Sequence, residues 1–124
     1  MDLYISMDHL PIFISIRKKP CIVIGGGDIA LRKINLLLKA QANVTCISPV
    51  FSEDIDSLAK NNNLRLIKKN FEDSDISNES IIISATNDSK VNAQVSAVAQ
   101  KLRIPVNVVD SPALSSFIMP SIVD

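Results

Sequence analysis

Short apolar runs alternate with longer amphipathic segments along the chain. Apolar residues recur at helical spacing over residues 29–40 and 91–102, which predicts two helices, the second capped by Asn87 or Asp88. Ser52 precedes two acidic residues, a pattern typical of a helix N-terminus, and predicts a further helix. Short runs rich in apolar or β-branched residues predict five strands, at 21–24, 43–48, 64–68, 80–85 and 105–109. This order predicts an α/β fold: a Rossmann-like, doubly wound, mostly parallel sheet with helices on both faces.

The three glycines of the chain are adjacent and lie between the first predicted strand and the first predicted helix. Gly25, Gly27 and Ala30 match the G-x-G-x-x-A fingerprint of dinucleotide-binding turns. In such turns the first glycine makes the bend, the second lets a pyrophosphate approach, and the alanine allows close packing. Free N–H groups at the helix start would hold the phosphates. The pattern predicts cofactor binding; the alternative is a tight turn without a ligand.

The second predicted strand ends without the acid that commonly binds the ribose in these folds. Ser48 stands at that place and can hydrogen-bond a ribose, while backbone groups of Pro49 and Val50 can line an adenine pocket. No Arg follows to hold a 2′-phosphate, so NADP is not favoured. The residues alone leave the choice between NAD and NADP open.

Ligands of open parallel sheets bind beyond the carboxyl ends of the strands. Thr86 follows the fourth predicted strand and Asp110 ends the fifth, so both are candidate site residues. A carboxylate at Asp110 could act as a general base beside a nicotinamide. Alternatively, it caps the turn at Ser111 by bonding nearby backbone N–H groups.

Composition narrows the function classes. Basic and acidic residues number 13 each, and this zero net charge gives no support to a nucleic-acid partner. No apolar run reaches the ~18–20 residues of a membrane span. Cys21 and Cys46 lie inside apolar runs and are predicted to be buried. With His9 as the single histidine, no protein-built metal site is expected. The cytoplasm is the expected compartment.

Five segments together resemble the N-terminal domain of siroheme synthase, the precorrin-2 dehydrogenase and sirohydrochlorin ferrochelatase module. They occur in the expected order and the resemblance covers residues 7–124. The segments are 7–13, 25–33, 85–92, 107–110 and 116–124. Five separate matches are far more specific than the glycine turn alone.

The resemblance implies an activity and its residues. The family oxidises precorrin-2 to sirohydrochlorin with NAD and then inserts ferrous iron to give siroheme. It implies dinucleotide contacts at Asp28 and Ile29 beside the glycines Gly25, Gly26 and Gly27, and at Pro49 and Val50. It also implies that Asp110 is the catalytic aspartate. The tetrapyrrole would itself supply the ligands for the iron, so no metal site of the protein is needed.

The resemblance also implies a domain organisation. Residues 1–113 are expected to form an NAD-binding domain, with 1–6 as an extension, because Met7 could itself start a protein. Residues 114–124 are expected to begin a dimerisation and substrate region that is missing here, and the complete family protein is expected to be a homodimer. Two alternatives stay open: a non-catalytic NAD-binding regulatory domain, and an inactive fragment. Regulatory domains usually carry an acid where this chain has Ser48.

Overall fold

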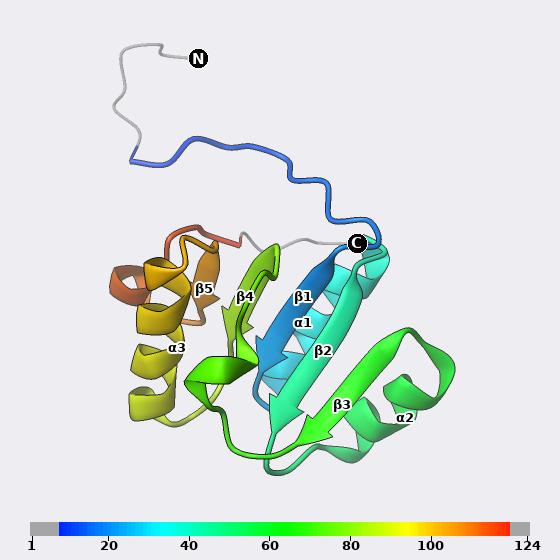
Figure 1. The fold of residues 1–124 in the computed structure, drawn as a ribbon. Helices are drawn as coiled ribbons and strands as arrows, with labels where there is room; N and C mark the ends of the chain where they lie inside the picture. The colour runs from blue at the N-terminus through cyan, green and yellow to red at the C-terminus, as the bar shows by residue number, and fades with distance from the viewer. Residues whose placement is uncertain (1–7, 120–124) are drawn as a thin grey trace.

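The computed structural model of the chain describes residues 8–119 and shows a five-stranded sheet flanked by helices (Figure 1). The strand order is β3-β2-β1-β4-β5, and all neighbouring strands are parallel. The strands are β1 (Pro20–Ile24), β2 (Asn43–Ser48), β3 (Leu64–Lys68), β4 (Ile81–Ser84) and β5 (Val106–Val108). The helices are α1 (Asp28–Lys39), α2 (Glu53–Asn61) and α3 (Ser89–Lys101), with short 3₁₀ turns η1 (Asp73–Asp75) and η2 (Pro112–Leu114). The predicted Rossmann-like α/β fold is confirmed.

Both faces of the sheet are covered, which explains the uninterrupted apolar character of the first strand. Cys21 and Val23 pack with buried residues of α1 and α2 on one face. Ile22 and Ile24 pack with buried residues of α3 on the other. The side chains of residues 21–24 in β1 are therefore all buried, as is typical of central parallel strands, while Pro20 at its start is exposed. The chain runs outward from β1 to β3 and then crosses back to β4, so the strand order reverses between β1 and β4.

The helix starts follow local capping chemistry at two of the three helices. Ser52 accepts a hydrogen bond from the Ile55 N–H at the start of α2, at 3.3 Å, as predicted. Asp88, rather than Asn87, caps α3, because its carboxylate accepts from the N–H groups of Lys90 and Val91. No side chain caps α1.

Some details differ from the sequence-based expectations. Leu102 was expected on the buried face of its helix but is 44% exposed, because α3 ends at Lys101 and Leu102 is already the C-cap. The 3₁₀ turns at 73–75 and 112–114 were not expected.

The chain after β5 covers the edge of the sheet. Ser116 donates its N–H to the Val106 carbonyl, at 2.8 Å, and its hydroxyl accepts from the Val106 N–H. The Ser115 hydroxyl accepts from the Val108 N–H. Backbone groups of an edge strand are thereby satisfied. The predicted extension at residues 1–6 lies outside the described residues, as do residues 120–124 of the predicted second region.

The remaining observations concern the chain away from the sheet edge where ligands bind. His9 is exposed, and the basic stretch 17–19 forms an exposed turn before β1. Among residues 8–119, no group of His, Cys, Asp and Glu side chains is arranged to hold a metal ion. Over the same residues, no helix combines the length and apolar character that crossing a membrane requires.

Candidate functional site

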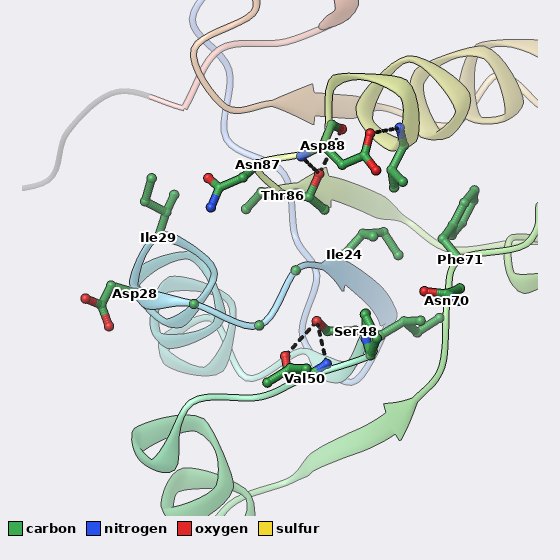
Figure 2. Close-up of a pocket in the computed structure, with 17 residues that line it drawn as sticks. Ile24, Asp28, Ile29, Ser48, Val50, Asn70, Phe71, Thr86, Asn87 and Asp88 are labelled. Carbon is green, nitrogen blue, oxygen red and sulfur yellow. Dashed lines mark hydrogen bonds between the residues drawn. The ribbon is translucent and has the colours of Figure 1, made fainter.

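A cleft of about 850 Å³ opens at the carboxyl ends of the strands, where the strand order reverses (Figure 2). It is lined by the glycine turn, the start of α1, the ends of β1 and β2, and the loops after β2, β3 and β4. Lining residues are Ile24, Gly25, Gly26, Gly27, Asp28, Ile29, Ile47, Ser48, Pro49, Val50, Asn70, Phe71, Ala85, Thr86, Asn87, Asp88 and Val91. Every residue predicted to bind the cofactor is in this set.

The first two glycines are required by packing. Gly25 has φ +134°, a conformation that side chains disfavour, and a Cβ there would collide with the carbonyl of Ala85. A Cβ on Gly26 would collide with the carbonyl of Val50. A Cβ on Gly27, in contrast, would meet no protein atom within 4 Å. The protein itself therefore does not need a glycine at position 27, whereas a ligand lying against the backbone does.

The start of α1 is the part of the cleft suited to an anion. The first hydrogen bond of this helix runs from the Leu31 N–H to the Gly27 carbonyl. The N–H groups of residues 28–30 therefore have no acceptor within the helix. With no side-chain cap, these donors and the positive end of the helix dipole are left for a ligand. Asp28 is exposed, and its carboxylate points away from the glycines (Figure 2). The arrangement fits a dinucleotide pyrophosphate.

The end of β2 uses its serine differently from the expectation. Ser48 is buried, and its hydroxyl donates to the Val50 carbonyl at 2.7 Å. Its single proton is therefore engaged within the protein, and the hydroxyl holds the turn at Pro49 in place beside Gly26. Among the described residues, none that lines the cleft is Lys or Arg. A ribose 2′-phosphate would thus lack a counter-charge, which favours NAD over NADP.

Asp110 lies at the same edge of the sheet but is not among the residues that line the cleft. Ser84 of β4 pairs with Val108 of β5, so Thr86 and Asp110 each lie two residues beyond a paired position. The side chain of Asp110 is exposed, and no hydrogen bond to it occurs among the described residues. The turn that Asp110 would cap in the alternative interpretation is closed by the backbone, from the Ser111 N–H to the Val108 carbonyl at 3.0 Å.

Sequence reasoning missed several residues of the cleft. Asn70 and Phe71 follow β3, and their position beyond a strand end was a usable signal because all strands of a parallel sheet end at one edge. Asn87 and Asp88 had been considered only as caps, and Val91 only as part of a helix face. These residues extend the cleft wall on both sides of the glycine turn (Figure 2).

Both cysteines are buried, as predicted. Burial raises the pKa of the Cys46 thiol to about 12 and that of the Cys21 thiol to about 11. The Cys46 thiol donates to the Gly25 carbonyl at 3.0 Å. The thiol therefore helps to hold the glycine turn in place, and it is not available as a nucleophile at neutral pH.

Comparisons with known proteins agree with this geometry. Residues 12–121 match a family model described as "Putative NAD(P)-binding". The siroheme synthase of Ruthia magnifica subsp. Calyptogena magnifica is 54% identical over 118 residues, which are 95% of this chain and 25% of that protein. The siroheme synthase of Nitrosomonas europaea is 46% identical over 119 residues, with the same coverage of 95% and 25%. The chain thus spans about a quarter of the length of these relatives.

A solved structure shares the fold. The chain described as "SirC, precorrin-2 dehydrogenase" superposes with a TM-score of 0.74 at 26% identity, covering 91% of this chain and 55% of that one. The family model covers most of the present chain and includes the whole glycine turn. The chain therefore belongs to this NAD(P)-binding family, and it is similar in sequence to the N-terminal region of siroheme synthases.

Proposed function

We propose that this chain is the NAD-binding domain of a siroheme synthase and takes part in the oxidation of precorrin-2 to sirohydrochlorin. One observation carries the proposal: the uncapped start of α1 opens into the cleft beside Gly27, where a side chain would meet no protein atom. The cofactor is NAD, held at its pyrophosphate by the N–H groups of residues 28–30. The turn at Pro49 and Val50 borders its adenosine half.

The residues of the chain divide the chemistry between binding and proton transfer. When bound, NAD supplies the acceptor for a hydride. Oxidation removes two electrons and two hydrogens from the substrate, one hydrogen leaving as hydride and the other as a proton. Asp110 accepts the proton, because its exposed carboxylate stands at the edge of the sheet where the β4–β5 register places it level with Thr86.

The proposal extends to the complete protein. The same carboxylate would accept protons from the ring nitrogens while ferrous iron, a substrate, enters the tetrapyrrole, whose nitrogens are its ligands. Residues 1–113 would form the NAD-binding domain, and residues 114–124 would begin the dimerisation and substrate region. The complete protein would act as a homodimer in the cytoplasm.

Two measurements test the proposal. Calorimetry should detect NAD binding to the isolated chain, because the glycine turn and the start of α1 are local. The formation of NADH from precorrin-2 and NAD, followed by absorbance, should be slow. Substrate positioning is worth up to ~7–11 kcal/mol of barrier, and the chain spans only part of its relatives. Turnover equal to that of a full-length siroheme synthase would contradict the expectation that the isolated chain is slow. Absence of NAD binding would contradict the proposal itself.

One observation favours a second candidate, a nucleotide-binding domain without chemistry: Asp110 is not part of the cleft wall. The full-length protein distinguishes the two. If it binds NAD but does not oxidise precorrin-2, the domain is a sensor of the nucleotide.

A further inference from the structure

A hydrogen-bond network lies behind the loop that joins β4 to α3. This loop, residues 85–88, forms one wall of the cleft. Asn92, in the first turn of α3, is half-buried behind it and is not one of the lining residues. Its side chain contacts both the end of the strand and the loop, so it joins three pieces of structure that meet at the cleft.

Each polar atom of the Asn92 amide has a defined partner. Its Oδ1 accepts from the Ser84 hydroxyl at 2.7 Å and from the Thr86 hydroxyl at 2.8 Å. Its Nδ2 donates to the Thr86 carbonyl at 3.1 Å. Ser84 is fully buried, so its hydroxyl depends on this partner. The Asn92 amide therefore holds Thr86 at both its side chain and its backbone.

The network also decides what Thr86 can offer a ligand. The Thr86 hydroxyl accepts from the Asp88 N–H at 3.1 Å, and the nearest acceptor for its single proton is Asn92 (Figure 2 shows the Asp88 bond). A bound ligand consequently meets the Thr86 backbone and methyl group, at a position that Asn92 sets. Thr86 was predicted to contact the cofactor directly, and the network shows how it is held in place.

The position of the loop relative to the cofactor follows from the topology. In dinucleotide-binding folds the pyrophosphate lies at the start of the first helix and the adenosine ribose at the end of the second strand. Because β2 and β4 lie on opposite sides of β1, the loop after β4 borders the nicotinamide half. We infer that Asn92 is a positioning residue: it holds the loop 85–88 in the position where the loop contacts the nicotinamide half of NAD. This inference rests on the proposed NAD site.

The test compares NAD with ADP, which lacks the nicotinamide half. Asn92→Asp preserves the shape and the two accepted bonds but replaces the Nδ2 donor, and sets a carboxylate oxygen against the Thr86 carbonyl. We expect NAD to bind about tenfold more weakly, while the affinity for ADP changes less than about twofold. Ser84→Ala removes one bond to Asn92 and should give a smaller shift of the same kind. Gln100→Leu on α3, which loses a bond to Ser96 away from the cleft, is the control and should leave both affinities unchanged.

The outcomes separate the possible failures. If wild-type protein binds neither NAD nor ADP, the proposed function fails. If wild-type protein binds both and the Asn92→Asp protein binds both equally well, the inference is wrong. A parallel loss of NAD and ADP affinity, matching a fall in melting temperature, would show a purely structural role and overturn the inference too. Ser84→Ala decides the case in which Asn92→Asp does not fold.

Discussion

Replacing Gly27 by Asp should stabilise the free protein and strongly weaken NAD binding, two effects of opposite sign. Gly27 is the N-cap of α1, with φ −105° and ψ −162°, and has open space where a side chain would lie. Asp is among the best N-cap residues because its carboxylate accepts from the first free N–H groups. Those same groups are the proposed pyrophosphate site, so cap and ligand compete for them.

The magnitudes follow from the position. Asp exceeds Gly at an N-cap by a few tenths of a kcal/mol. Its interaction with the helix dipole adds ~0.3–1 kcal/mol, part of which repulsion from the exposed Asp28 removes. A net gain of ~0.5 kcal/mol should raise the melting temperature by about 2 °C. Two unit charges 4 Å apart near a protein surface interact by ~4 kcal/mol, so NAD affinity should fall on the order of a hundredfold or more.

Thermal unfolding and calorimetry on the same samples check both signs. Ser57→Asp, on the exposed side of α2, adds the same charge elsewhere and should leave NAD affinity unchanged. Gly26→Ala should lower the free energy of unfolding by ~1–3 kcal/mol, because its Cβ collides with the Val50 carbonyl. Gly27→Val should block binding without adding charge. Unchanged NAD affinity in both Gly27 variants would refute the placement of the pyrophosphate, and a large loss of stability would refute the claim that this position is open.

Two further predictions concern stability. Because burial raises the pKa of Cys46 from 9.0 to about 12 and of Cys21 to about 11, the folded protein holds both protons more tightly than the unfolded chain. Their contribution to the free energy of unfolding is complete below pH 9 and is lost as the pH rises towards these values. The urea concentration at the unfolding midpoint should therefore fall above pH 9, and less steeply in Cys46→Ala. A midpoint independent of pH in this range would contradict this prediction. Ser52→Ala should cost ~1 kcal/mol through loss of the α2 cap, lowering the melting temperature by about 4 °C, and an unchanged melting temperature would show that the cap contributes nothing.

The fold was predictable because its signals are local. The strands at 43–48 and 64–68 have the predicted bounds, since the first run ends at Pro49 and the second ends at a polar stretch. The glycine turn was predictable for the same reason: the glycines lie between an apolar run typical of a buried strand and a segment with helical spacing of its apolar residues. Elsewhere the observed boundaries of strands and helices differ from the predicted ones by one or two residues.

The contacts within the cleft were less predictable, because they depend on where side chains point. The end of β2 indicated that Ser48 was available to a ribose, yet its hydroxyl turns back to Val50. Nothing in the spacing of Ser84, Thr86 and Asn92 indicates that they meet, since this requires the particular loop between β4 and α3.

Asp110 differs from most other residues with positive φ in this chain. Gln41 and Arg103 have φ of +63° and +59°, and each follows the C-cap of a helix, α1 or α3. There, backbone bonds from Ala42 to Leu37 and from Ile104 to Ala99 complete the common helix-ending motif. Asp110, at φ +61°, instead follows a strand, at the third position of a turn closed by Ser111. Gly or Asn is preferred at such a position, so the backbone gives no reason for an aspartate.

Asp110→Asn therefore separates the backbone requirement from the chemistry. Asn suits the left-handed conformation at least as well as Asp, and no hydrogen bond to the carboxylate is lost among residues 8–119, so the melting temperature should not fall. NAD affinity should be unchanged, since Asp110 is not part of the cleft wall. In the full-length protein, precorrin-2 oxidation should fall by ~10²–10⁴-fold, the usual contribution of a general base. Gln41→Gly, which eases the same backbone conformation at the end of α1, should leave oxidation unchanged. Oxidation by the Asn variant at the wild-type rate would show that Asp110 is not the base.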